Sequence, residues 1–372
     1  MKLENDTRIV MTLDAGGTNF VFSAIRSNKE IVSPVTLPSN GNDLGHCLSN
    51  IINGFSKVRE SLPYAPSAIS FAFPGPADYP MGIIGDLGNL PAFRGGIALG
   101  PMLEEQFKLP VFINNDGDLF VYGEAIAGFL PYVNSLLEEA GSPKRFSNLF
   151  GVTLGTGFGA GIVRNGELFT GDNSGAGEIW LLRNKINPSI NAEEGASIRA
   201  VRRVYAESLH IAPEDAPEPR EIYEIAEGKM PGNKGAAIYA FRQMAEVVGD
   251  ALANALTLID GLAVIGGGIA GAHKLFLPAI VEEMNSNYLL PSGKCFPRLA
   301  VKTFNLEDEN ELKAFLKGDK KEIKVPGSSR TVTYDPLRRL GVGISKMGTS
   351  KAVSVGAYAF ALNQLDSGQK KS

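Results

Sequence analysis

Three glycine-rich segments of the chain have the composition of phosphate-binding turns, because each of them follows an apolar, strand-like run. They are Gly16, Gly17 and Thr18; Gly155, Thr156 and Gly157; and Gly266, Gly267 and Gly268. The backbone of a tight turn can direct several N–H groups at one point, and glycine lets an anion approach without a Cβ in the way. One such segment alone could be a hairpin turn that needs a positive φ. Three of them favour a bound nucleotide.

Two aspartates stand where apolar runs end. Asp14 stands two residues before Gly16 of the first glycine turn, and Asp116 closes the segment PVFINND. Phosphoryl transfer to an alcohol needs a positioned hydroxyl, and a carboxylate within hydrogen-bond reach can orient that hydroxyl and take its proton. The alternative interpretation of Asp116 is a turn in which Asp118 caps a helix that begins near Leu119.

Other phosphate-binding motifs fit the chain less well. It contains no G-x-x-x-x-G-K-[ST] segment. The segment GTGFGA at 155–160 satisfies G-x-G-x-x-A, but a strand and hairpin pattern follows it instead of the helix that a dinucleotide site needs. We therefore exclude a Rossmann site.

The elements that must hold these residues follow a repeated pattern. Residues 8–37 alternate as strand, glycine turn, strand, polar turn and strand, and residues 148–170 repeat that pattern, which indicates a duplicated domain. Strands and helices then alternate, as is typical of an α/β fold. The predicted helices are 44–62, 99–107, 198–208, 234–258, 273–285 and 350–365, with another starting at Leu119, and the predicted strands include 68–73 and 110–116. Two segments, 129–147 and 305–348, look like additions to this pattern.

Composition narrows the class of protein. The 372 residues are 44% hydrophobic and 20% charged, which permits a sizeable core and about two domains. A net charge of -4 without long basic runs argues against a nucleic-acid partner. No leader pattern and no apolar stretch of about 18 residues occurs, so we expect no membrane association and a cytoplasmic protein. Cys47 and Cys295 are far apart, and so are His46, His210 and His273, so neither a disulfide nor a cysteine-based zinc site is expected.

Several motifs together resemble the ROK family, whose name covers repressors, uncharacterised open reading frames and sugar kinases. They are DAGGT at 14–18, PGPAD at 74–78, NLPAFRG at 89–95, INND at 113–116, TLGTGFGAGI at 153–162, GAGEI at 175–179 and VIGGGI at 264–269. The resemblance implies an actin-like and hexokinase-like (ribonuclease H-like) α/β fold, duplicated into two lobes, with ATP and a hexose in an interlobe cleft. It implies a lobe of 1–124 completed by helix 350–372, and a larger lobe of 125–349 with an insertion at 305–348.

The resemblance also implies roles for particular residues. The three glycine turns would bind the phosphates of ATP, and Asp14 would hold Mg²⁺ through water, because Mg²⁺ keeps most of its hydration shell. Asp116 would be the catalytic base. The sugar would contact Gly75, Asn89, Asn115, Asp116, Glu178 and Glu193, with Glu194 as the alternative to Glu193.

The chain departs from the family at its zinc-binding segment. Leu181 stands where many members have a histidine, and the stretch 177–197 contains no cysteine, so no zinc site is expected there. We expect Trp180 and Leu181 to pack into the gap, with stacking of Trp180 on a sugar as the alternative. Because that histidine also touches the sugar in the family, glucose, N-acetylated hexosamines, fructose and other hexoses all stay open.

The function expected from these features is an ATP-dependent hexose kinase acting on the 6-hydroxyl of glucose or a related sugar. The alternatives are a catalytically inactive sugar-binding or regulatory protein, and a kinase for fructose or an N-acetylated hexosamine. Asp14 lies too near the start of the chain for a preceding DNA-binding domain, which argues against a repressor. Because dimers are common in the family, the resemblance implies a homodimer.

Overall fold

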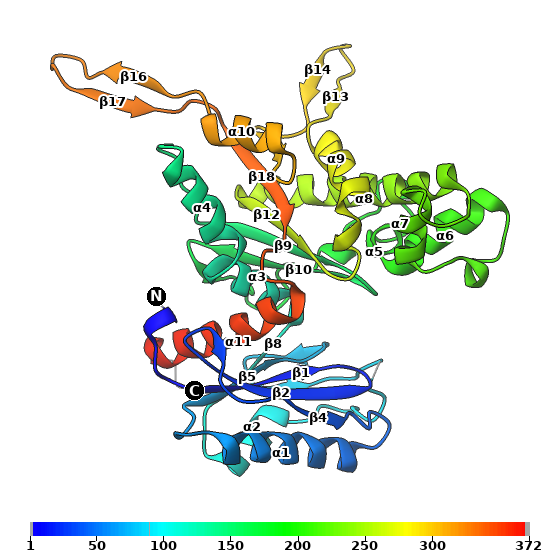
Figure 1. Ribbon diagram of the computed structural model, residues 1–372, viewed down its shortest axis with the longest axis vertical. Helices are drawn as coiled ribbons and strands as arrows, with labels where there is room; N and C mark the ends of the chain where they lie inside the picture. Colours follow the sequence, from blue (N-terminus) through cyan, green and yellow to red (C-terminus); the bar gives the residue numbers. More distant parts are fainter. Residues whose placement is uncertain (1–2, 89, 369–372) are drawn as a thin grey trace. The chain divides into compact units, whose positions relative to one another are not determined.

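The computed structural model describes residues 3–88 and 90–368, which form two compact units (Figure 1). The first unit consists of the residues up to Ala127, the segment Glu167–Ala176 and the residues from Met347 onward. The second unit consists of Gly128–Gly166 and Gly177–Lys346. Residues 167–176, which we expected in the second lobe, therefore belong to the first unit.

A twisted sheet forms the centre of the first unit. Its strands are β1 (Val10–Ala15), β2 (Asn19–Arg26), β3 (Lys29–Glu30), β4 (Val35–Pro38), β5 (Ala68–Ala72) and β8 (Val111–Asn114). They lie in the order β3-β2-β1-β5-β8, with β4 paired to β2. β1 and β2 are antiparallel, whereas β1, β5 and β8 are parallel. The carboxyl ends of these three parallel strands therefore lie at one edge of the sheet.

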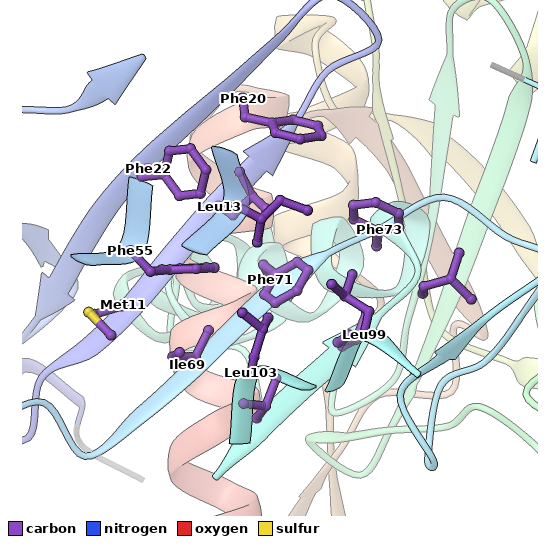
Figure 2. Close-up of a cluster of buried hydrophobic side chains, with 14 of the residues drawn as sticks. Met11, Leu13, Phe20, Phe22, Phe55, Ile69, Phe71, Phe73, Leu99 and Leu103 are labelled. Carbon is purple, nitrogen blue, oxygen red and sulfur yellow. The ribbon is translucent and has the colours of Figure 1, made fainter. Parts of the chain in front are cut away.

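Apolar side chains pack α1 (Leu44–Ser61) and α2 (Leu99–Phe107) onto one face of this sheet. Figure 2 shows this core, in which Phe55 of α1 meets Phe22 of β2 edge to face, with ring centroids 5.1 Å apart. A Cβ on Gly54 would collide with the Phe22 ring, so a glycine is needed where this helix crosses the strand. This core holds the strands of the sheet in place, and the sheet in turn determines the positions at which β1 and β8 end.

The helices α3 (Asp116–Ile126) and α11 (Thr349–Ser367) pack closely against each other. Their contact is backbone to backbone, because a Cβ on Gly123 would overlap the Ala352 carbonyl and a Cβ on Gly356 would overlap the Leu119 carbonyl. The predicted closing helix thus holds the helix on which Asp116 stands.

The second unit repeats the same strand pattern. Its strands are β9 (Leu149–Leu154), β10 (Phe158–Arg164), β12 (Leu262–Gly266), β15 (Lys302–Asn305) and β18 (Arg339–Ile344). They lie in the order β10-β9-β12-β18-β15. β9 and β10 are antiparallel, and β9, β12, β18 and β15 are parallel. The succession β10-β9-β12-β18 reproduces β2-β1-β5-β8 of the first unit, so the predicted duplication is confirmed.

Helices make up most of the remainder of the second unit. They are α4 (Phe129–Glu139), α5 (Glu193–Ala196), α6 (Ile198–Leu209), α7 (Pro219–Ala226), α8 (Lys234–Ile259), α9 (His273–Met284) and α10 (Glu309–Lys317). The 3-10 turns are η1 (Leu3–Asn5), η2 (Ile179–Leu181), η3 (Pro213–Asp215) and η4 (Ala270–Ala272). Short strands complete the chain: β6 (Ala77–Asp78), β7 (Ile83–Ile84), β11 (Glu167–Leu168), β13 (Asn287–Leu289), β14 (Cys295–Pro297), β16 (Lys321–Lys324) and β17 (Thr331–Tyr334).

Neither of the two expected additions is a separate insertion. The segment 129–147 begins with α4, which buries Phe129, Leu130, Val133 and Leu137. The segment 305–348 contains β18, a buried strand between β12 and β15, and only the β16–β17 hairpin projects from it (Figure 1). The sequence concealed β18 because the strand begins with a charged residue and lies within a charged, turn-rich segment. That residue, Arg339, is fully buried and pairs with Asp335 at 2.6 Å.

Candidate active site

The two predicted carboxylates of the first unit lie near each other. Asp14 is close to the end of β1, and Asp116 follows β8 as the first residue of α3. Because β1, β5 and β8 are parallel, both residues are delivered to the same edge of the sheet. Burial raises the pKa of the Asp14 carboxyl, and the charge of Asp116 raises that pKa further. Two neighbouring carboxylates of this kind can orient a hydroxyl and attract a cation.

Asn115 fixes Asp116 at the start of α3. The Asn115 Oδ1 accepts a hydrogen bond from the Gly117 N–H at 2.7 Å, which makes Asn115 the N-cap of the helix. Asp116 Oδ1 accepts from the same N–H at 2.9 Å. Burial raises the pKa of Asp116, and the Gly117 N–H partly opposes this shift. A carboxylate with a raised pKa is a better proton acceptor than an ordinary aspartate.

The alternative interpretation of this segment is wrong in its details. The helix begins at Asp116 instead of near Leu119, and its cap is Asn115 and not Asp118. Asp118 is buried in the first turn of the helix. The cap is displaced toward the strand because Asn115 already has the extended backbone that an N-cap requires.

The turn between β1 and β2 contains two glycines, Gly16 and Gly17, which differ in the space available beside the backbone. A Cβ on Gly16 would lie 2.8 Å from the Asn19 carbonyl oxygen, so the folded chain itself requires glycine there. A Cβ on Gly17 would meet no atom within 4 Å. Ser39 holds the turn from the side, because its hydroxyl donates to the Gly17 carbonyl at 2.5 Å and its N–H donates to the Thr18 carbonyl at 2.9 Å.

The glycine turns of the second unit divide in the same way. A Cβ on Gly155 or Gly268 would meet nothing within 4 Å. Gly267 has a φ of +91°, and its Cβ would overlap the Leu154 backbone, so its glycine serves the packing of β12 against β9. Each of the three turns thus retains one glycine, namely Gly17, Gly155 or Gly268, beside space that the chain does not fill. Such a space suits the phosphates of a nucleotide.

Glu193 contacts the turn between β9 and β10. Its Oε2 accepts a hydrogen bond from the Phe158 N–H at 3.0 Å and would lie 2.8 Å from a Cβ on Gly157. Its Oε1 lies 2.7 Å from Nη2 of Arg199. Glu194, the alternative sugar ligand, pairs with Arg199 at 2.6 Å, and its side chain forms no hydrogen bond with the described residues of the turn. The geometry therefore favours Glu193 over Glu194 as the residue associated with this turn.

Glu178 precedes η2, and its carboxylate accepts a hydrogen bond from the indole N–H of Trp180. Leu181, at the position of the family's histidine, is 59% exposed, so the expectation that it packs into a gap is wrong. Trp180 is half-buried, and its indole N–H is already used in the hydrogen bond to Glu178.

The other predicted site residues are placed as follows. Gly75 precedes Pro76 in a loop of the first unit, and its Cβ would lie 3.1 Å from the Tyr79 hydroxyl. Asn89 lies outside the described residues. In the residues that the structure describes, no group of three or more His, Cys, Asp or Glu side chains is arranged to hold a metal ion. Cys47 is buried and Cys295 is exposed.

The first unit contains a cavity of about 720 Å³. Tyr79, Asn114, Tyr122, Glu167 and Asn363 are part of its lining, and none of the predicted site residues is. Over the described ranges, no helix has the length and apolar character needed to span a membrane.

Sequence reasoning missed Arg199. Its guanidinium joins Glu193, Glu194 and the Thr156 carbonyl, all of which belong to the second unit. The spacing from Glu193 to Arg199 is six residues and crosses the break between α5 and α6, so it matches no helical ion-pair pattern. The signal becomes visible only once the two helices are placed.

The chain is similar to proteins of known family, sequence and structure. A profile described as the ROK family matches residues 10–312. A crystal structure of glucokinase from Parabacteroides distasonis is 56% identical, with a TM-score of 0.89, over 98% of this chain and 99% of that one. Glucokinase from Thermotoga maritima is 27% identical over 75% of this chain and 88% of its own length. N-acetyl-D-glucosamine kinase from Vibrio vulnificus is 26% identical over 76% of this chain and 90% of its own.

Proposed function

Because the chain belongs to the ROK family, we propose that it is a sugar kinase that transfers the γ-phosphoryl group of ATP to the 6-hydroxyl of glucose or a related hexose. The observation that carries the proposal is the proximity of Asp14 and Asp116 at the carboxyl ends of the parallel strands β1, β5 and β8. The fold is the hexokinase-like fold of ROK sugar kinases.

Asp116 is the proposed base. Its position at the first residue of a capped helix fixes its carboxylate, so the side chain loses little freedom when it accepts a hydrogen bond from a sugar hydroxyl. It would orient the hydroxyl oxygen toward the phosphorus and hold the proton as the new bond forms. Asn115, Gly75, Glu178 and Glu193 are the proposed sugar contacts of the described residues, and Asn89 is a further one.

The chain's residues suit ATP and Mg²⁺. The open spaces beside Gly17, Gly155 and Gly268 would receive phosphate oxygens against backbone N–H groups, with the Thr18 and Thr156 hydroxyls as further donors. Asp14 has the hard oxygen ligands that Mg²⁺ prefers, and one carboxylate is sufficient because the ion keeps its waters and binds phosphate. When bound, Mg²⁺ would neutralise charge on the phosphates. Asp14 would contribute a fixed negative site for it.

Glucose is the proposed substrate because the 56% identical protein is a glucokinase across the full length of the chain. The N-acetyl-D-glucosamine kinases are more distant, so an N-acetylated hexosamine is the second candidate, and fructose is the third. A homodimer and a cytoplasmic location stay predictions.

The test is a screen of glucose, N-acetylglucosamine, N-acetylmannosamine and fructose with ATP and Mg²⁺, which measures ADP release and identifies the phosphorylated sugar. We expect ADP and glucose 6-phosphate in equal amounts. ADP release without sugar phosphate would contradict the proposal. Sugar binding without turnover by any hexose would favour the inactive sugar-binding protein.

A further inference from the structure

We propose that Arg199 is a positioning residue that joins the turn at Gly155–Gly157 to Glu193 and so couples the binding of nucleotide to the binding of sugar. This inference rests on the proposed function, because it takes the turn as a phosphate site and Glu193 as a sugar contact. It adds a residue that none of the motifs contains.

The contacts of Arg199 reach both proposed ligand sites of the second unit. Its Nη1 donates to the Thr156 carbonyl at 3.1 Å, and its Nη2 donates to Glu193 Oε1 at 2.7 Å. Its Nε and Nη2 also donate to Glu194 Oε1, at 3.1 Å and 2.6 Å. One planar guanidinium therefore holds the backbone of the turn and the carboxylate together.

Two further hydrogen bonds join the turn at Gly155–Gly157 to the segment that carries Glu193 and Arg199. Glu193 Oε2 accepts from the Phe158 N–H at 3.0 Å, on the far side of the turn from Thr156. The Ile198 N–H, next to Arg199, donates to the Gly155 carbonyl at 2.8 Å. Turn, glutamate and arginine thus form a ring of contacts in which none of the three can shift alone.

Glu193 keeps capacity for a sugar within this ring. Each carboxylate oxygen has two lone pairs. The hydrogen bond from Arg199 uses one on Oε1, and the hydrogen bond from the Phe158 N–H uses one on Oε2. The remaining lone pairs can accept hydrogen bonds from sugar hydroxyls, whose direction then depends on where Arg199 holds the carboxylate. Glu194 anchors the arginine from the other side, and the pairing with Arg199 holds the pKa of Glu194 below its usual range.

Because Arg199 is exposed, its effect on ligand binding can be measured apart from any effect on folding stability. Its side chain is 49% exposed, and ion pairs at such sites contribute little to folding stability. The fork geometry matters more, because a lysine ammonium cannot span a carbonyl and two carboxylates in one plane. A phosphate that moves the Gly155 turn would, through Arg199, move Glu193, and binding free energies coupled in this way are reciprocal.

The experiment measures the dissociation constant of glucose with and without a saturating non-hydrolysable ATP analogue and Mg²⁺. The full chain is used as wild type, Arg199→Met and Arg199→Lys. Titration calorimetry gives the constants, and fluorescence of Trp180, the only tryptophan, reports on the site beside Glu178. Arg242→Met is the matched control, because Arg242 forms an exposed ion pair with Glu282 in the same unit and contacts no proposed ligand residue.

We expect the analogue to change the glucose constant of the wild type by roughly 5-fold or more, within the usual range of coupling between sites. Arg199→Met should reduce that factor to near one and raise KM for glucose more than it lowers kcat. Arg199→Lys should restore part of the effect, and Arg242→Met should match the wild type. All four proteins should unfold at similar temperatures.

Two results would overturn the inference while leaving the proposed function intact. One is a wild type that phosphorylates glucose without any coupling, and the other is an Arg199→Met variant with wild-type coupling and wild-type KM. Failure of the unmodified chain to bind or phosphorylate any hexose would instead contradict the proposed function, and this inference would fall with it.

Discussion

The carboxylates of Asp14 and Asp116 are near enough that the charge of Asp116 contributes to raising the pKa of Asp14. The two residues are 102 positions apart in the sequence, and the parallel pairing of β1, β5 and β8 brings them to one edge of a sheet. Carboxylates that repel each other in this way are costly to the folded state, which suggests that they are kept for chemistry.

Replacement of Asp116 by asparagine should remove turnover while sparing the sugar site. The amide keeps nearly the same shape and can still hydrogen-bond a hydroxyl, but it cannot take the proton. We expect kcat to fall by roughly 10²–10⁴-fold. The coupled ADP assay measures this loss, and the dissociation constant of glucose should change only a few-fold. Unchanged kcat would exclude Asp116 as the base.

The same replacement should make the protein more stable at neutral pH. Because the pKa of Asp116 is raised above 3.8, the folded state binds its proton more tightly than the unfolded state does. Stability therefore falls as the pH rises from 3.8 through the raised pKa, and the penalty is complete above it. Asp116→Asn should unfold at a higher temperature than wild type at pH 7.5, and the difference should shrink as the pH is lowered toward 3.8. A variant that is less stable at pH 7.5 would contradict the raised pKa.

The pH profile of turnover should show the same shift. A base must be ionised, so kcat should decline on acidification at a pH above the ordinary aspartate value of 3.8. Initial rates at saturating substrates, measured from below pH 3.8 up to pH 8, test this, with the coupling enzymes checked separately. An acid limb at or below 3.8 would indicate an unperturbed base.

Substitutions of Gly267 and Gly268, in the turn after β12, should affect folding stability and nucleotide binding respectively. Gly267→Ala places a Cβ against the Leu154 backbone at a φ of +91°, and we expect it to lower the free energy of unfolding by about 1–3 kcal/mol. Gly268→Ala meets nothing within 4 Å, so the fold should survive. Its affinity for ATP should fall about tenfold, or roughly 1.4 kcal/mol. Denaturant unfolding and nucleotide titration of both variants give the comparison, and equal ATP affinity in Gly268→Ala and wild type would argue against a phosphate beside Gly268.

The ion pair between Asp335 and Arg339 should matter more than its surface counterpart. Arg339 is 0% and Asp335 3% exposed, so Asp335→Ala leaves a buried guanidinium without its carboxylate, at a cost of about 3–5 kcal/mol. Lys321→Ala removes an ion pair with Asp319 in which both partners are more than half exposed, and should cost under about 1 kcal/mol. Urea unfolding measures both. Similar costs for the two variants would show that the buried pair does not anchor β18.

Much of the fold follows from local sequence patterns. Strands β1, β2, β9 and β10 and helices α1, α2, α8 and α11 are apparent in the sequence because their apolar periodicity and their glycine or polar boundaries are local properties. The repeated strand and glycine turn also indicated the duplication, since both copies carry the same local pattern. Asp14 and Asp116 were identified as candidates because each follows an apolar run.

Only the tertiary structure decided which of these residues act together. Gly267 and Gly268 are alike in sequence, yet the backbone of Leu154, from a distant part of the chain, fills the space beside Gly267 and leaves the space beside Gly268 open. Arg199 meets Thr156 across 43 positions, and β18 is buried by two strands that are distant in sequence. Local periodicity carries no information about such long-range contacts, because they depend on how the elements pack.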